Sequence, residues 1–278
     1  MPTQPPRERR EAVTLHCQQL KLFGVLHLPL LPSEESFPGV VICHGLAGTK
    51  VGKHRLYVRM AETLAAHGIA TLRLDFRGCG DSEGSFLNTS LSNAVEDTLL
   101  GLDFLKNHPE IDSSRLSLLG RSLGGPIAVK TAKQFKQISS LVLWAPLFTP
   151  KPWLAEWEAH QSHHVNDPNA PVWFQGELNS PQMMREIFSL DMQSELTSLI
   201  DTPLMIAHSE GDQVIQPDQQ ALYLQCRQNA NAETRDLRLK IGDHHFHDHD
   251  EQKQVIDASL TFLTKHFNMR APHSSKTF

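Results

Sequence analysis

The sequence predicts an α/β protein built on a mostly parallel, eight-stranded sheet with helices on both faces. Short apolar or alternating runs recur along the chain, and segments of helical length separate them. Several runs are continuously apolar, which is typical of strands covered on both faces. Right-handed crossovers between such strands give a doubly wound sheet. With 278 residues, 40% of them hydrophobic and 21% charged, the chain can bury a sizeable core.

Each expected element rests on its own pattern of apolar residues. Residues 13–19 and 21–28 alternate apolar and polar side chains, which indicates a half-buried antiparallel pair. Six further strands are expected, at residues 39–43, 69–75, 115–119, 138–144, 203–208 and 237–241. Helices with a periodic apolar face are expected at residues 55–67, 91–107, 122–135, 217–227 and 252–267.

One segment, residues 149–200, interrupts this alternation between the sixth and seventh strands. It holds three of the four tryptophans and an amphipathic stretch at residues 183–190. A segment of this length and apolar content is not a plain loop, so we expect a small cap or lid. The expected domain organisation is one discontinuous core at residues 12–148 and 201–268, the cap at 149–200, and flexible tails at 1–11 and 269–278.

Composition and charge exclude several classes of protein. The formal net charge of −5 argues against a nucleic-acid binder, which usually shows a basic excess. No apolar stretch approaches the eighteen or so residues of a membrane span, and residues 1–13 lack the apolar region of a secretory signal. We therefore expect a cytoplasmic protein. No C-x-x-C pair is present, so structural roles are expected for the four cysteines, Cys17, Cys43, Cys79 and Cys226.

The sequence G-R-S-L-G at residues 120–124 is the motif that carries chemistry. A serine on a sharp strand-to-helix turn is held in a strained backbone conformation, which lifts its hydroxyl clear of the sheet. Bulky residues two positions away on either side would collide across such a turn, which accounts for Gly120 and Gly124. Ser122 is therefore the candidate nucleophile, with a serine at a helix N-cap as the structural alternative.

A candidate acid and a candidate base follow the last two expected strands. Asp212 comes after residues 203–208, and the run D-H-H-F-H-D-H-D at 243–250 comes after residues 237–241. Both therefore lie with Ser122 at the carboxyl edge of the sheet, where open α/β sheets bind their ligands. We expect His244 to remove the Ser122 proton and Asp212 to orient the imidazole.

Both assignments have neighbouring competitors. Glu210 competes with Asp212, which we favour because it opens the following turn. Three further histidines of the run compete with His244, namely His245, His247 and His249. Alternating imidazoles and carboxylates are also good metal ligands. A solvated loop is the commoner structure for such a run, and we expect neither a metal nor an organic cofactor.

An oxyanion hole needs two backbone amides, and the loop H-G-L-A-G at residues 44–48 follows the third strand. The candidate donors are the amides of Leu46 and Leu123. Apolar residues of the expected cap are candidates for an acyl or aromatic site, with packing inside the cap as the equal alternative. The foremost of them are Trp153, Trp157, Trp173 and Phe174.

Together these motifs resemble the α/β-hydrolase superfamily. The segments that carry the resemblance are HGLAG at 44–48, DFRGCGDSEG at 75–84, GRSLGG at 120–125, D-x-V at 212–214 and DHHF at 243–246. More narrowly, residues 20–267 resemble the small serine esterases that include bacterial cinnamoyl and feruloyl esterases, and the S33 serine aminopeptidase-like hydrolases. The resemblance implies the α/β-hydrolase fold with a cap between strands 6 and 7, His244 as catalytic histidine, and the Leu46 and Leu123 amides as oxyanion donors.

We therefore expect a serine hydrolase of the carboxylesterase type (EC 3.1.1). It would cleave carboxylic esters of small to medium acyl or aromatic acids through a Ser-His-Asp triad and an acyl-enzyme. Thioester or amide cleavage would use the same groups, and a non-catalytic binding module is the remaining alternative. The expected partner is a small-molecule ester, with no nucleic acid and no membrane span. A homodimer is left open.

Overall fold

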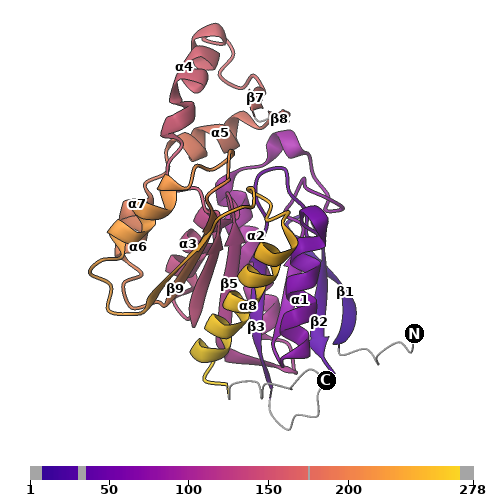
Figure 1. The fold of residues 1–278 in the computed structure, drawn as a ribbon. Coiled ribbons are helices and arrows are strands. Elements are labelled where there is room, and N and C mark those ends of the chain that lie inside the picture. The colour runs from indigo at the N-terminus through magenta and orange to yellow at the C-terminus, as the bar shows by residue number, and fades with distance from the viewer. Residues whose placement is uncertain (1–7, 31–35, 175, 270–278) are drawn as a thin grey trace.

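A computed structural model describes residues 8–30, 36–174 and 176–269 of the chain. Eight strands form one sheet (Figure 1). In spatial order they are β1 (Glu8–Cys17), β2 (Leu20–Pro29), β4 (Ala70–Leu74), β3 (Phe37–Cys43), β5 (Ile111–Arg121), β6 (Ser140–Trp144), β9 (Leu204–Ser209) and β10 (Thr234–Leu239). The β1–β2 and β2–β4 pairs are antiparallel, and the other five pairs are parallel. The expected mostly parallel sheet of eight strands is confirmed.

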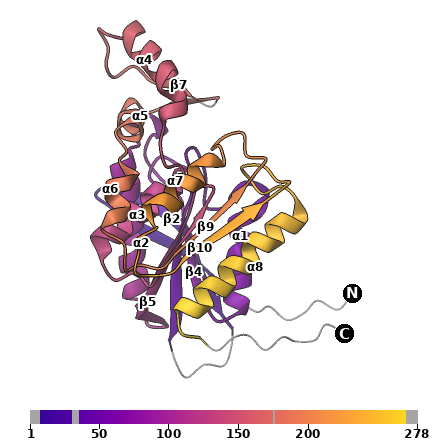
Figure 2. The same ribbon diagram turned by 60° about the vertical axis from the view of Figure 1, so that its left-hand side comes forward.

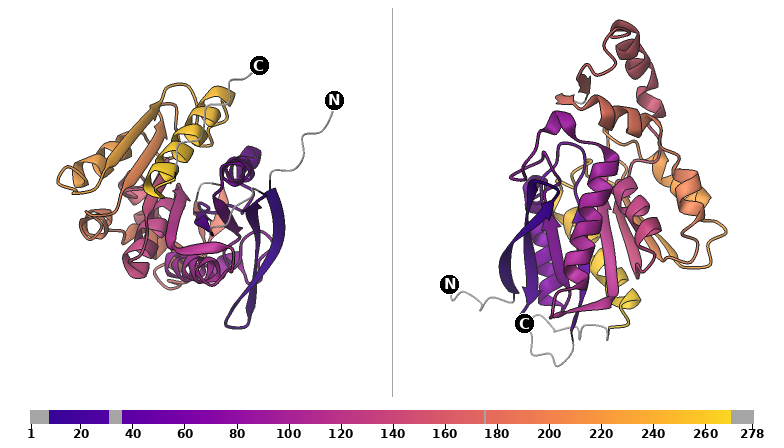
Figure 3. Two further views of the ribbon diagram at one scale, coloured as in Figure 1. Left: turned by 90° about the horizontal axis from the view of Figure 1, so that it is seen from below. Right: turned by 180° about the vertical axis from the view of Figure 1, so that it is seen from behind.

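Helices cover both faces of the sheet (Figure 3). One face is packed by α1 (Leu56–Ala66) and α8 (His249–His266). The other is packed by α2 (Leu91–Lys106), α3 (Gly124–Phe135) and α7 (Asp218–Cys226). Short 3-10 helices precede α1 and α2, at Lys53–Arg55 and Phe86–Asn88, and a third lies at the start of the insertion after β6, at Lys151–Trp153.

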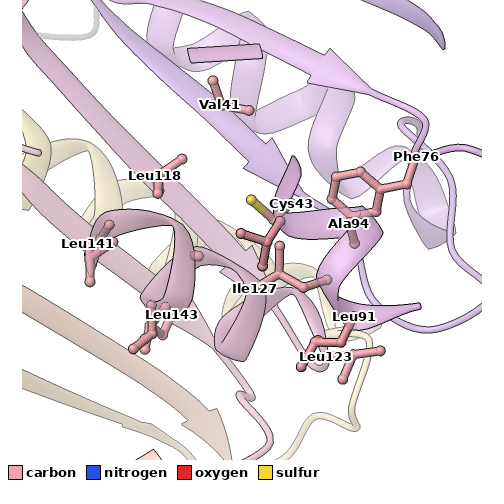
Figure 4. Packing of buried hydrophobic residues seen from close by; sticks show 14 of the residues in the cluster. Val41, Cys43, Phe76, Leu91, Ala94, Leu118, Leu123, Ile127, Leu141 and Leu143 are labelled. Carbon is pink, nitrogen blue, oxygen red and sulfur yellow. The ribbon is translucent and has the colours of Figure 1, made fainter. Parts of the chain in front are cut away.

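The core between the sheet and its α2–α3 layer positions the carboxyl ends of the central strands. Figure 4 shows Val41 of β3 and Leu118 of β5 on the sheet side of this core, with Ile127 of α3 and Leu91 and Ala94 of α2 packed over the sheet. All of these side chains are buried. Helices cover β3, β5 and β6 on both faces, so most side chains of these strands are buried. This burial explains why their sequences are continuous apolar runs.

The segment between β6 and β9 holds a small group of elements of its own. They are α4 (Leu154–His163), β7 (Val172–Phe174), β8 (Glu177–Asn179), α5 (Pro181–Phe188) and α6 (Met192–Thr197). The β7–β8 hairpin forms a separate two-stranded antiparallel sheet. Helix α6 is tied to α3 by ion pairs from Lys130 and Lys133 to Glu195. Helix α4 projects farthest from the main sheet (Figures 1 and 2).

Several boundaries differ from those expected from the sequence. Strand β1 begins at Glu8, so residues 8–11 belong to a strand rather than to the expected tail at 1–11. These residues pair with β2, and Arg10 forms an ion pair with Glu62 of α1. The expected tail at 269–278 lies outside the described residues except for Met269.

The last strand also lies elsewhere than expected. β10 spans Thr234–Leu239 rather than 237–241, because it is an edge strand with only one buried side chain, Leu239, and carries little apolar signal. Helices α4 and α6 were not expected at all. In the described parts of the chain, no helix has the length and apolar character that a membrane span requires.

Candidate active site

Ser122 occupies a sharp turn between β5 and α3. Its φ is 57°, in the left-handed region that a residue with a side chain rarely adopts. The turn is fixed from both sides: the Ser122 amide donates to the Trp144 carbonyl at 2.9 Å, and the Ser122 carbonyl accepts from the Gly125 amide at 3.0 Å. Backbone strain that is held in place in this way is typical of functional turns.

Two glycines make this turn possible. A Cβ on Gly120 would collide with the carbonyl of Gly124, and a Cβ on Gly124 would collide with the carbonyl of Cys43 at the end of β3. The turn is therefore packed directly against the neighbouring strand, and only glycine fits at either position. The explanation of the G-x-S-x-G spacing from the sequence agrees with these contacts.

The loop after β3 lies beside Ser122. A Cβ on Gly45 would come within 3.0 Å of the Ser122 Cβ, so the two backbones are close. The buried His44 ring braces this loop, because its Nε2 accepts from the Phe76 amide at 3.2 Å and its Nδ1 lies 2.9 Å from the Gly45 carbonyl. The ring is thus the neutral Nδ1–H tautomer, and burial lowers its pKa. Leu46 and Leu123, the expected oxyanion donors, both border the cavity above Ser122.

Asp212 lies in the turn that follows β9 and is fully enclosed. Its Oδ1 accepts from the amides of Val214 and Ile215, both at 2.8 Å. Its Oδ2 accepts from His244 Nδ1 at 2.7 Å and from His208 Nε2 at 3.1 Å. Burial acts to raise the pKa of Asp212, but the hydrogen bonds from the two histidines outweigh it and hold that pKa well below its usual range.

His244 lies in the loop after β10, and its Nδ1 faces Asp212. That contact places the proton on Nδ1 and leaves Nε2 free to act as a base. Burial lowers the pKa of His244, and the Asp212 carboxylate offsets only part of this effect. The imidazole is therefore neutral near pH 7. His244 and Ser122 border the same cavity, so the structure brings the three expected residues to one edge of the sheet.

The residues that compete with Asp212 and His244 for the roles of acid and base do not take part in the Asp212–His244 contact. Glu210 is exposed, and so are His247 and His249, of which His247 binds the Asp243 carboxylate in its own loop. His245 is partly buried, and burial together with Arg121 lowers its pKa to about 4. None of these side chains contacts the Asp212 carboxylate.

Two residues of the site were missed from the sequence. His208, at the end of β9, donates from Nε2 to both Asp212 and the Ile215 carbonyl, the latter at 2.8 Å. Arg121, immediately before Ser122, donates to the His244 carbonyl from Nε at 3.2 Å and from Nη2 at 3.0 Å. The available signal was a basic residue at the buried carboxyl end of an apolar strand, next to Ser122 in the case of Arg121 and four residues before Asp212 in the case of His208.

A cavity of about 230 Å³ opens above Ser122. The core supplies Leu147, Val214 and Ile215 to its wall, and the insertion supplies Trp153, Phe174 and Ile187. Of the four aromatic residues expected at an acyl site, Trp153 and Phe174 thus border the cavity.

The structure does not place the other two there. Trp157 stacks on Phe188 with ring centroids 5.1 Å apart, and it borders a second hollow within the insertion. Trp173 is 68% exposed, because side chains alternate along β7 and its neighbours Val172 and Phe174 take the buried side.

The mostly parallel eight-stranded sheet, with Ser122, His244 and Asp212 at its carboxyl edge, has the α/β-hydrolase fold. Residues 35–187, more than half of the chain, match the family described as serine aminopeptidase, S33. The chain belongs to this hydrolase family.

Individual relatives are distant. The chain is 30% identical over 135 residues to the quorum-quenching protein AidA of Acinetobacter baumannii, covering 48% of this chain and 43% of that protein. It is 28% identical over 190 residues to lysophosphatidylserine lipase ABHD12 of Danio rerio, covering 66% of this chain and 45% of that protein. The matches thus span less than half the length of these two relatives.

Among solved structures, the chain resembles Est1E from Butyrivibrio proteoclasticus with bound ferulic acid. The TM-score is 0.75 at 21% identity, covering 92% of this chain and 100% of that chain. A likeness at this identity establishes the fold.

Proposed function

We propose that the protein is a serine hydrolase that cleaves carboxylic esters of small to medium acyl or aromatic acids. The observation that carries this proposal is the 2.7 Å contact between His244 Nδ1 and Asp212 Oδ2, at the cavity that also holds the strained Ser122. Nucleophile, base and orienting acid are the three parts that acyl transfer requires.

In the proposed reaction, His244 Nε2 takes the Ser122 proton as Oγ attacks the acyl carbon. The negative charge that develops on the acyl oxygen is received by the amides of Leu46 and Leu123 and by the amino end of α3. The imidazolium then gives its proton to the departing alcohol. A water molecule, activated by the same imidazole, hydrolyses the acyl-enzyme and restores Ser122.

The cavity supports the substrate class in size and lining. A volume of about 230 Å³ with walls of Leu147, Trp153, Phe174 and Ile187 suits a short aliphatic or a single aromatic acyl group. In this proposal residues 149–200 serve as the cap, because they supply three of these side chains. The structurally similar Est1E was solved with ferulic acid, a single-ring aromatic acid, bound.

The test is labelling of the purified protein with a fluorophosphonate probe, followed by turnover of p-nitrophenyl acetate and butyrate and of matched thioester and amide substrates. We expect stoichiometric labelling that is lost in Ser122→Ala. We also expect loss of turnover in His244→Ala, with His247→Ala as the matched control from the same loop. Unchanged turnover in Ser122→Ala would overturn the proposal, and faster thioester or amide cleavage would redirect the substrate class.

A further inference from the structure

Four arginines are buried in the described part of the chain, and one of them is bound differently from the others. They are Arg73, Arg77, Arg121 and Arg227. A buried guanidinium without a countercharge is costly, so a protein normally pairs it with carboxylates or satisfies all of its nitrogens. Arg77 is paired with carboxylates, because it forms ion pairs with Asp97 and Glu96.

In two of the others, all of the guanidinium nitrogens form hydrogen bonds. Arg73 uses all three nitrogens, on the His27 ring and the Lys50 carbonyl. Arg227 also uses all three, on the carbonyls of Leu199 and Thr202 and the hydroxyl of Thr234. Both side chains are therefore fully committed to holding the fold together.

Among the described residues, Arg121 is neither paired with a carboxylate nor hydrogen-bonded through all of its nitrogens. Its Nε and Nη2 bind the His244 carbonyl, and Nη2 also lies 2.6 Å from His245 Nδ1. Among the described residues it forms no ion pair with a carboxylate, and its Nη1 has no hydrogen-bond partner. Arg121 is only 7% exposed, yet it borders the cavity above Ser122. A largely buried cation therefore lies at the wall of the cavity, and its Nη1, which is not among the buried unpartnered atoms, is open to solvent or a ligand.

His245 completes this part of the wall. Its Nδ1 accepts from Arg121, so the neutral ring carries its proton on Nε2 and can donate a second hydrogen bond. The remaining charged side chain at the cavity, Glu177 of β8, is exposed and forms no ion pair with Arg121. The positive charge of Arg121 is thus not neutralised by the residues around the cavity.

We infer that Arg121, assisted by His245, binds an anionic group of the substrate, a carboxylate or a phosphate, on the alcohol side of the ester. The inference rests on the proposed function and names the substrate class of the same site. Arg121 and His245 adjoin His244, which in the proposed reaction protonates the departing alcohol, whereas the amides of Leu46 and Leu123 receive the acyl oxygen. A guanidinium matches carboxylate and phosphate oxygens in geometry as well as in charge.

The experiment compares acetate esters that differ only in charge. The carboxylate arm pairs 3- and 4-acetoxybenzoate with the corresponding neutral acetoxybenzamides, and the phosphate arm pairs 4-acetoxyphenyl phosphate with its neutral dimethyl phosphate ester. We expect wild-type kcat/KM to favour an anionic ester by about tenfold, mainly through KM. The arm with the larger anion-to-neutral ratio of kcat/KM shows whether the bound group is a carboxylate or a phosphate.

Three variants assign the preference to Arg121. Arg121→Gln is expected to bring the anion-to-neutral ratio to about one, and Arg121→Lys to keep part of it. Because Arg121 also holds the His244 loop, both variants lose activity towards every ester, and the ratio removes this common loss. Glu177→Gln is the matched control, because it removes the opposite charge from the same cavity. It is expected to leave the anion-to-neutral ratio of kcat/KM intact or to increase it.

A wild-type ratio at or below one for all anionic esters would overturn the inference, and so would a ratio that survives in Arg121→Gln. Should that variant fail to fold, protection of wild-type Ser122 against the fluorophosphonate decides the matter. 4-Hydroxybenzoate or 4-hydroxyphenyl phosphate is expected to protect better than 4-hydroxybenzamide, and equal protection overturns the inference. Failure of the proposed function is distinct, because no ester would then turn over and Ser122 would not be labelled.

Discussion

The two walls of the active-site cavity are built in different ways. On the core wall, the candidate catalytic residues are held by several hydrogen bonds each: two backbone hydrogen bonds fix the turn at Ser122, and two turn amides and two histidine side chains bind the Asp212 carboxylate. On the insertion wall, Trp153 and Phe174 touch one another edge to face and lie on a 3-10 helix and a three-residue strand. On the proposed function, the chemistry would depend on the more heavily hydrogen-bonded wall and the substrate fit on the other.

The largest effect is expected on the core wall, from Asp212→Asn. Asparagine has nearly the same shape, but its amide group favours the wrong His244 tautomer, so kcat should fall by about 10⁴-fold with folding retained. Steady-state kinetics with thermal unfolding as the folding check measures this. Glu210→Gln, at an exposed carboxylate two residues away, is the control and should behave as wild type. An active Asp212→Asn enzyme would mean that the core wall does not direct the chemistry.

A glycine from each region tests the difference in rigidity. Gly124→Ala drives a methyl group into the carbonyl of Cys43 and should lower the free energy of unfolding by about 3 kcal/mol. Gly176 also has a constrained backbone, with φ at 79°, but no atom lies within 4 Å of an added Cβ. Gly176→Ala should therefore cost only about 1 kcal/mol. Urea unfolding measures both, and equal losses would contradict the contrast between the walls.

The pH profile sharpens the role of His208. In the proposed mechanism the neutral form of His244 is the active one. Because its pKa is lowered, we expect the acid limb of kcat/KM to lie below the usual histidine value near 6.5, with activity lost as pH falls through it. His208→Leu removes a hydrogen bond from Asp212, so the carboxylate attracts the His244 proton more strongly. The acid limb should move up by roughly half a pH unit, and kcat/KM should fall about fivefold.

His208→Gln is the matched variant, because a glutamine amide nitrogen reaches about as far as Nε2 and keeps the donor. It should restore the acid limb towards the wild-type position. Loss of thermal stability in both variants with no movement of the limb would show that His208 only supports the fold of the turn.

The smallest effect is expected on the insertion wall. Phe174→Ala should raise KM for aromatic and butyrate esters by roughly two- to fourfold, with little change for acetate or in kcat. Trp157→Ala is the control, because Trp157 packs on Phe188 away from the cavity and should not alter the order of substrate preference. A uniform fall in kcat for Phe174→Ala would instead connect this wall to the chemistry.

The same contrast explains how much could be predicted from the sequence. The sheet and the three residues at its carboxyl edge were predictable, because continuous apolar runs, a glycine-flanked serine and a fixed chain order are local patterns. Arg121 was not, because its partner His244 lies 123 residues further along the chain and only the fold brings it near. The partners of His208 are local, but no sequence pattern shows that its ring turns back onto Asp212. In the insertion, composition indicated apolar packing but could not separate Phe174, which borders the cavity, from Trp173, which faces solvent.

The insertion occupies a crossover between two adjacent strands, and this has an evolutionary consequence. β6 and β9 pair in parallel, so the chain must return along the sheet in any case, and α6 packed on α3 makes that return. The elements from α4 to α5 lengthen a connection that already exists, at a cost in loop closure that grows only slowly with length. A lineage could therefore exchange this segment, and with it the residues Trp153, Phe174 and Ile187 that line the cavity, while the strand register and the turn at Ser122 stay unaltered.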